Sequence, residues 1–245
     1  MNIRDTLNLR YMKDLTATAA GRAHILRQLA DAESTGESAI FDRVLARVTD
    51  PPLARMIEKH RSDEIRHEIM FRKCLARTHQ SEEQTPDHLR VIRRLDEKLG
   101  HLLDRPIRDA RDITEAYLVL QVLEERAVHE FAFLERAFRD VDPETADTLA
   151  LVLKDERRHL LYCQAIARRY TPDDEQRAAM LQRIRRLEAE AYLENRRANM
   201  QHVRERRIIR RESRRLFWRA LEALMPGAAL PFTDFAGPQV AQQAA

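Results

Sequence analysis

Apolar residues recur at helical spacing along most of the chain. The first stripe, which includes Leu26, Ile40, Val44 and Val48, predicts a helix over about residues 14–48. Strands are not indicated, because glycine is scarce and leaves little turn chemistry, whereas Ala, Leu, Arg and Glu are abundant. The sequence therefore favours long helices.

A second helix follows closely on the first. The segment Thr49-Asp50-Pro51-Pro52 ends the first helix, because proline restricts the residue before it and is well suited to open the next helix. Leu53, Ile57 and Phe71 then continue an apolar stripe that predicts a helix over about 52–78. Two helices joined by so short a turn are expected to lie antiparallel.

A second pair of helices is predicted after a long connection. The chain is polar over 79–86, and a shorter helix is expected over about 87–103. The third long helix is predicted over about 109–139 and the fourth over about 144–170. An up-down pair, a crossover and another up-down pair predict a four-helix bundle in which the crossover travels the length of the bundle.

The composition changes beyond the fourth helix. Residues 173–225 are rich in arginine, and we expect one long or broken helix with a thin apolar stripe there. The tail at 226–245 contains Pro and Ala and is expected to be poorly ordered. The predicted organisation is a helix-bundle domain over 1–172 with its core at 20–170, an arginine-rich helical extension and a flexible tail.

The overall composition agrees with an all-α class. The chain has 245 residues, 44% of them hydrophobic, and only 5 Gly, which suits one large helical domain. No apolar run approaches the roughly 20 residues that cross a bilayer, and the N-terminus lacks a secretion signal, so we expect a soluble cytoplasmic protein without a membrane span. Cys74 and Cys163 lack metal-type spacing and are expected to be packing residues.

One pattern of charged residues occurs twice. Asp63-Glu64-Ile65-Arg66-His67 returns 92 residues later as Asp155-Glu156-Arg157-Arg158-His159, and the same shift carries Glu33 onto Glu125. The shift also relates further pairs: Leu26 and Leu118, Phe41 and Phe133, and Asp50-Pro51 and Asp142-Pro143. A single Glu-x-x-His would indicate an ordinary exposed turn, whereas the matched pair indicates a duplicated half-bundle.

These residue types at this spacing suit a pair of metal ions. Glu64 and His67 are three residues apart and share a helix face, as do Glu156 and His159. With Glu33 and Glu125 they form an oxygen-rich set of four carboxylates and two imidazoles, which suits iron or manganese. Four buried carboxylates repel one another unless cations neutralise them.

Each copy also places an aspartate directly before its glutamate. A metal-bound imidazole usually donates its other N–H to a carboxylate, which sets the tautomer of the ring. We expect Asp63 to support His159 and Asp155 to support His67. The alternative is that both aspartates are solvated helix residues.

The constellation resembles the ferritin-like di-iron carboxylate superfamily, whose motif is a Glu followed by Asp/Glu-Glu-x-x-His, twice. The resemblance covers about residues 20–170 and favours the oxygenase or oxidase type rather than iron-storage ferritin. It implies a ferritin-like bundle with a long crossover and an additional C-terminal helix, in which the metal centre itself is catalytic. It further implies that Glu64 and Glu156 bridge the irons, with Glu33 and His67 on one and Glu125 and His159 on the other.

Several neighbouring residues are further candidates. Glu124 competes with Glu125, because an apolar stripe selects Glu124 whereas the repeat selects Glu125, which we favour. His60, one turn before Glu64, is a candidate additional ligand, and arylamine N-oxygenases look similar in carrying an extra imidazole. Additional ligand or proton-relay candidates, each with a packing or surface role as the alternative, are Glu37, His129 and Tyr162.

The function expected from these residues is oxidation of a small organic substrate with O2 at two iron ions, with a manganese–iron pair left open. An external ferredoxin or flavin reductase would supply electrons, and no haem, flavin or nucleotide is predicted. One alternative is a rubrerythrin-like peroxidase or ferroxidase, although the chain has no Cys-x-x-Cys pair.

The arginine-rich extension leaves a second alternative open. It could contact nucleic acid, as in a tRNA- or RNA-modifying di-iron hydroxylase. The formal net charge is only +3 and glutamates are interspersed, which favours a solvated helix or a homodimer contact.

Overall fold

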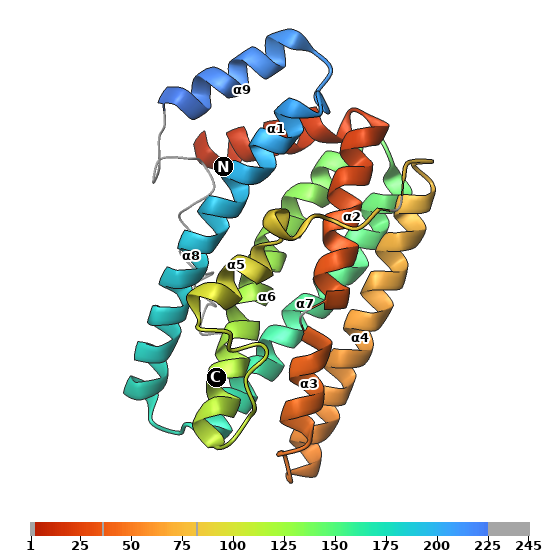
Figure 1. The fold of residues 1–245 in the computed structure, drawn as a ribbon. Coiled ribbons are helices and arrows are strands. Elements are labelled where there is room, and N and C mark those ends of the chain that lie inside the picture. The colour runs from red at the N-terminus through yellow and green to blue at the C-terminus, as the bar shows by residue number, and fades with distance from the viewer. Residues whose placement is uncertain (1–2, 36, 82, 225–245) are drawn as a thin grey trace.

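The protein is helical throughout the part that the computed structural model describes, which is residues 3–35, 37–81 and 83–224, with backbone alone at 4, 35, 37–39 and 222–224. Within these residues there are nine α-helices and no strand, so the predicted all-α class is confirmed (Figure 1). The helices are α1 (Ile3–Thr16), α2 (Ala19–Thr35), α3 (Glu37–Leu45), α4 (Pro51–Ala76), the short 3-10 helix η1 (Asp87–Leu89), α5 (Val91–Lys98), α6 (Ala110–Phe138), α7 (Pro143–Tyr170), α8 (Asp174–Glu205) and α9 (Glu212–Leu224).

The central bundle has four helical positions, which are occupied by α2 with α3, by α4, by α6 and by α7. α2 and α3 pack along α4, α6 packs along α7, and α4 contacts α7 to join the two pairs. The chain leaves α4 at one end of the bundle and returns to the opposite end before α6 begins, so the crossover runs along the bundle as predicted (Figure 1). α8 packs on α6 and α5, and thus covers the crossover side of the bundle.

The two halves begin their second helix in the same way. The Asp50 side chain accepts the backbone N–H of Leu53 at 3.3 Å, ahead of the two prolines that open α4. The Asp142 side chain accepts the backbone N–H of Thr145 at 3.1 Å, ahead of Pro143. An aspartate cap followed by proline satisfies an otherwise unpaired N–H group and starts a helix abruptly. This explains why the predicted starts of α4 and α7 agree with the structure.

Other predicted boundaries were wrong. The single helix expected over 14–48 is three helices, α1, α2 and α3. Between α1 and α2 the chain bends so tightly that a Cβ atom on Gly21 would lie 1.9 Å from the carbonyl oxygen of Leu15. The Thr18 hydroxyl accepts the N–H of Gly21 at 3.0 Å and caps α2. Apolar spacing continues across this bend, because both helices present their apolar faces to the same core.

One further element is shorter than predicted. The crossover contains η1 and the short helix α5 rather than one helix over 87–103. The arginine-rich segment, expected as one long or broken helix, is broken into α8 and α9, with Arg207 in a left-handed conformation (φ 51°) at the break. The predicted tail at 226–245 lies outside the described residues. Among the helices that are described, none combines the length and apolarity required of a membrane span.

The apolar core is divided into two clusters. One cluster includes Phe71 of α4 and Phe131 of α6, and the other includes Ile57 of α4 and Tyr117 of α6. Along α7 the order is reversed, because this helix runs the other way. The buried acidic and histidine side chains of the repeat lie between the two clusters, in a polar layer across the bundle.

Candidate metal centre

The polar layer is built by four helices. α4 supplies His60, Glu64 and His67 from its buried face, at intervals of four and three residues that keep them on one side of the helix. The remaining members are Glu33 from α2, Glu124 from α6, and Glu156 and His159 from α7. Each of these seven side chains is at most 9% exposed. Such deep burial of so many ionisable groups requires partners or cations.

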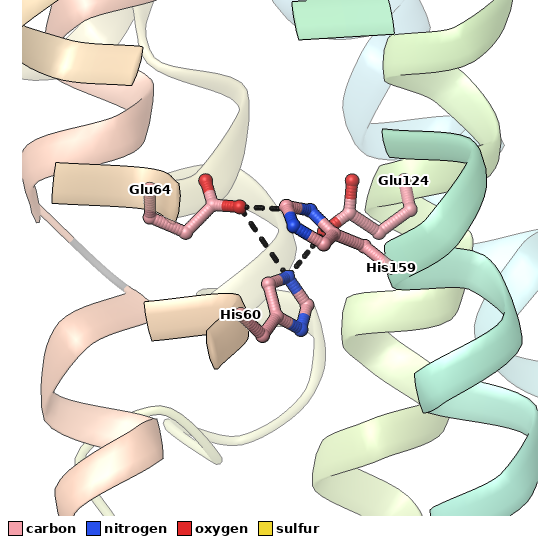
Figure 2. A group of neighbouring side chains, drawn as sticks. All are labelled: His60, Glu64, Glu124 and His159. Atoms are coloured by element: carbon pink, nitrogen blue, oxygen red, sulfur yellow. Dashed lines mark hydrogen bonds and ion pairs between the residues drawn. The ribbon is translucent and has the colours of Figure 1, made fainter. Parts of the chain in front are cut away.

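Four of the seven side chains form a first group, shown in Figure 2. The ligand atoms of His60, Glu64, Glu124 and His159 lie within 4.8 Å of one another. His60 Nε2 lies 2.7 Å from Glu124 Oε1, and His159 Nδ1 lies 3.1 Å from Glu64 Oε1. The His60 and His159 rings stack with their centroids 3.9 Å apart. This group is a compact set of two imidazoles and two carboxylates.

A second group lies next to the first and shares a member with it. The ligand atoms of Glu33, Glu64, His67 and Glu156 also lie within 4.8 Å of one another. His67 Nδ1 lies 3.3 Å from Glu156 Oε1 and 3.8 Å from Glu33 Oε2. Glu64 belongs to both groups, and the second oxygen of Glu156 lies 3.0 Å from His159 Nδ1. Glu64 and Glu156 therefore lie between two potential ion positions, and they are the two residues for which the resemblance implies a bridging role.

The outer edge of each repeated histidine faces the aspartate of the other copy. His159 Nε2 lies 3.4 Å from Asp63 Oδ2, and His67 Nε2 lies 3.3 Å from Asp155 Oδ2. These are the two pairings that the sequence predicted. Because each Nε2 faces a carboxylate, the N–H of each ring is favoured at Nε2 and Nδ1 is left to face the cluster.

Two arginines complete this arrangement, and sequence reasoning overlooked both. Arg158 donates to Asp63 at 2.7 Å and lies 2.7 Å from Asp155, while Arg66 donates to both aspartates. Burial raises the pKa of Asp63, but contacts with Lys59 and Arg158 outweigh it and lower that pKa to about 2. The signal was present in the sequence, because Arg66 and Arg158 correspond under the 92-residue shift.

The carboxyl groups of the cluster differ in their electrostatic surroundings. Burial raises the pKa of Glu124 well above its usual range, and the nearby Glu156 carboxylate raises it further. Burial also opposes ionisation of Glu64, but contacts with Glu33 and His159 outweigh it and lower the pKa of Glu64. The four carboxylates thus compete for the positive charge of the three imidazoles. A cation placed among them would favour the ionised form of Glu124.

Three buried atoms of the cluster residues lack a hydrogen-bond partner: His60 Nδ1, Glu64 Oε1 and His67 Nδ1. The last two are among the atoms that face the groups described above. Contacts of Glu64 Oε1 at 3.1 and 3.3 Å with the rings of His159 and His60 do not have hydrogen-bond geometry. Unpaired buried acceptors are costly, whereas coordination to a cation would satisfy them. The residues present therefore fit a metal pair.

Glu124, and not Glu125, reaches the cluster, which corrects the choice made from the repeat. The Glu125 carboxylate instead lies 2.6 Å from Arg185 of α8 and accepts a hydrogen bond from Gln121 at 3.0 Å. The apolar stripe of α6 decides the outcome, because adjacent residues of a continuous helix point about 100° apart and only one can face the layer. The matching stretch of the first copy is divided between α2, which ends at Thr35, and α3, which begins at Glu37, so the two copies differ in structure here.

Of the remaining candidates, His129 and Tyr162 lie outside the two groups. His129 is partly buried and packs against the Phe133 ring at 5.0 Å. Tyr162 is partly buried, with its ring 6.4 Å from the His159 ring. The side chain of Glu37 lies outside the described residues. Cys74 and Cys163 are free and buried in the apolar clusters, as predicted.

A cavity of about 230 Å³ adjoins the polar layer. Glu33, Glu64, Glu124 and Glu156 line one part of it, and the rest of the wall comes from α1, α2, the crossover, α6 and α8. The cluster is therefore accessible to a small molecule held inside the bundle. Comparisons of the chain with protein-family models, curated proteins and solved structures find no match.

Proposed function

We propose that the polar layer holds two metal ions and that the protein uses them with O2 to oxidise a small organic substrate. The observation that carries this proposal is the pair of buried ligand groups that share Glu64 and adjoin a cavity. A set of four carboxylates and three imidazoles favours iron, or an iron and manganese pair, over a tetrahedral zinc site. The fold assignment that goes with it is a ferritin-like bundle, supported by the repeat and the lengthwise crossover.

The two ion positions would be unequal. Glu33, Glu64, His67 and Glu156 would hold one ion, and His60, Glu64, Glu124 and His159 the other. Two reduced iron ions supply electrons for the activation of O2. Around them Asp63 and Asp155 hold the imidazole tautomers, and the apolar clusters on either side exclude water. Electrons for repeated turnover would come from an external ferredoxin or flavin reductase.

The first test is metal content, measured on protein purified from iron-supplemented cells. We expect two ions per chain in the unaltered protein. Glu156→Ala and His159→Ala should lose metal, because the first removes a carboxylate ligand that lies between the two ion positions and the second removes an imidazole ligand of one of them. The sharper comparison is Glu124→Gln against Glu125→Gln. The first should lose metal, whereas the second should retain it, since Glu125 is paired with Arg185 instead.

Circular dichroism would establish that each variant is folded before its metal is counted. Equal metal content in the Glu124→Gln and Glu125→Gln proteins would contradict the proposed ligand set. Absence of metal from the unaltered protein, even after anaerobic addition of Fe(II), would contradict the function itself. Oxygen consumption with aldehydes, arylamines and fatty acids would then test the reaction.

The alternative of a ferroxidase or peroxidase uses the same ligands. The adjoining cavity favours an organic substrate, because iron or peroxide alone would not require an apolar chamber of this size. Rapid catalytic oxidation of Fe(II), with no acceleration by any organic compound, would favour the ferroxidase instead.

Ion pairs within the fold support a structural role for the arginine-rich helices. Arg183 lies 3.1 Å from Glu115, Arg185 pairs with Glu125, and Arg214 lies 3.6 Å from Asp14. Side chains used in this way are less available for phosphate groups. The RNA-modifying alternative accordingly has less support than oxidation of a small molecule.

A further inference from the structure

We infer that the cavity beside the cluster binds a neutral, mainly apolar molecule of about nine non-hydrogen atoms that carries one O–H or N–H donor. As a statement about the substrate, this inference rests on the proposed function. As a statement about binding, it rests on the cavity alone. Its size is the first argument: an apolar cavity of about 150 Å³ holds benzene, so about 230 Å³ suits a molecule roughly half as large again.

The wall of the cavity is largely apolar. It includes Ile25 and Leu29 of α2, Leu89 and Ile92 of the crossover, and Leu123 and Phe131 of α6. Ligand contact with such side chains is favourable in proportion to the apolar area removed from water. A strongly polar molecule would gain little here and would lose its hydration.

Outside the polar layer, four charged groups of the wall are already paired with other protein groups: Asp31, Arg90, Arg126 and Glu130. Arg126 donates two hydrogen bonds to Glu188, at 2.9 and 2.8 Å, and stacks over the Tyr192 ring at 3.8 Å. The Tyr192 hydroxyl in turn donates to Glu130 at 2.7 Å. An ionic ligand would have to separate one of these buried pairs, which is costly. This favours a ligand without net charge.

The charged groups where the crossover meets α2 are also paired within the protein. Asp31 of α2 is buried and accepts the backbone N–H of Thr85 at 2.6 Å. Arg90 lies 3.9 Å from Asp31 and donates to the carbonyl of Thr85 at 2.8 Å. The carboxylate and the guanidinium on this side are therefore also occupied in holding the fold together.

Outside the polar layer, two uncharged polar groups of the wall have a buried atom without a hydrogen-bond partner. The Thr85 hydroxyl is one of them, and it can donate as well as accept a hydrogen bond. The other is the side-chain oxygen of Asn195 of α8, which can only accept one. The neighbouring amides are used internally, because Gln28 donates to the side chain of Asn199, which itself donates to the backbone oxygen of Asn195. A buried acceptor without a partner favours a ligand that donates one hydrogen bond. Together these features select a compact neutral alcohol, phenol or amine.

Four small probe molecules of similar size test separately whether the ligand must donate a hydrogen bond and whether it must be uncharged. The isomers 4-ethylphenol and 4-methylanisole differ in whether they donate a hydrogen bond, while benzoate and phenethylammonium carry opposite charges. Binding to the full chain would be measured by calorimetry, with and without metal. We expect 4-ethylphenol to bind about fivefold more tightly than 4-methylanisole, as one net hydrogen bond implies. Both ions should bind at least tenfold more weakly than 4-ethylphenol.

Two variants test whether the probes bind in this cavity. Ala127→Leu fills the chamber from α6 and should weaken both neutral probes at least tenfold, whereas Ala132→Leu, on the same helix but outside the lining, should not. Asn195→Leu should reduce binding of 4-ethylphenol to the level of 4-methylanisole. Unchanged binding of 4-methylanisole to that variant would show that the cavity is intact.

The outcomes separate this inference from the proposed function. Tight binding of benzoate or phenethylammonium, or unaltered binding of the neutral probes to Ala127→Leu, would overturn the inference. Two metal ions per chain without binding of any neutral probe would overturn it while leaving the metal centre standing. Binding of 4-ethylphenol by a chain that takes up no metal would support the cavity and contradict the oxidation.

Discussion

His60 makes the two halves of the duplicated cluster unequal. Under the 92-residue shift its counterpart on α7 is Val152, which is fully buried but offers no donor atom. His60 reaches Glu124 and Glu64 and stacks on His159, so one ion position has an imidazole more than the other. The two ions are therefore expected to bind with different affinities.

Replacing His60 by the residue of the other copy tests this difference. In His60→Val we expect one ion to bind at least tenfold more weakly, because a nitrogen donor is lost, while the other ion is nearly unaffected. Anaerobic calorimetric titration with Mn(II) would resolve the two affinities. Equal weakening of both, or of neither, would show that His60 is only a packing residue beside the cluster.

His24 gives the protein a separate dependence on pH. Burial, together with the nearby charges of His202 and Arg27, lowers the pKa of His24 to about 4. The unfolded chain binds this proton near pH 6.5, whereas the folded chain resists it until about pH 4. The buried neutral ring therefore makes its full contribution to the unfolding free energy above pH 6.5, and this contribution is lost as the pH falls toward 4.

The expected loss is up to about 3 kcal/mol over that interval. It would be measured as the difference in unfolding free energy between the unaltered protein and His24→Gln in urea titrations from pH 7 to 4.5. The unaltered protein should show the steeper decline. Parallel curves for the two proteins would contradict the assignment and point to other groups.

Most of the cluster could be predicted from sequence, because the repeat concerns residues three apart on a helix face. That local spacing predicted the positions of Glu64, His67, Glu156 and His159 without knowledge of tertiary contacts. The choice between Glu124 and Glu125 depended instead on how α6 is rotated against its neighbours. The ion pair of Glu125 with Arg185 comes from α8, a segment with no counterpart in the repeat.

At the scale of the helices, boundaries were predictable where a local signal marked them. The Asp-Pro caps marked the starts of α4 and α7, and their starts were placed correctly. The bend between α1 and α2 carries no proline, and apolar residues continue through it. The bend depends on the close approach of Gly21 to Leu15, and the spacing of apolar residues along the sequence does not reveal this contact.

Gly21→Ala should therefore destabilise the fold although alanine favours helices. Its Cβ would lie 1.9 Å from the Leu15 carbonyl oxygen, so α1 must shift. We expect a loss of about 1–3 kcal/mol in unfolding free energy, as in overpacked cores. Ala20→Gly, at the adjacent position, provides a comparison near 1 kcal/mol from helix propensity alone. A stabilised Gly21→Ala protein would contradict the tight bend.

For the whole molecule, the polar layer separates the two apolar clusters from each other. Carboxylates that repel one another at this position weaken the contact between the halves, and cations would strengthen it. Bound metal should thus contribute to global stability as well as to chemistry. This coupling is a property of where the layer lies and does not depend on which reaction occurs there.

Adding metal should raise the unfolding free energy by about 3 kcal/mol per ion when the free ion exceeds its dissociation constant a hundredfold. Thermal unfolding in the presence of Mn(II), compared with a chelator, would measure the shift. In Glu64→Gln the shift should be much smaller, because Glu64 belongs to both groups. A shift of full size in that variant would indicate that the metal binds elsewhere.

The origin of the chamber wall has a consequence for how such a protein could change. The duplicated segments carry all seven residues of the polar layer, whereas α1, the crossover and α8 supply one side of the chamber and lie outside the repeat. Substitutions in those added parts would alter what fits inside while the donor atoms keep their positions. Under the proposed function, selectivity and reactivity would therefore lie in different stretches of the chain, and new specificities could be engineered without altering the polar layer.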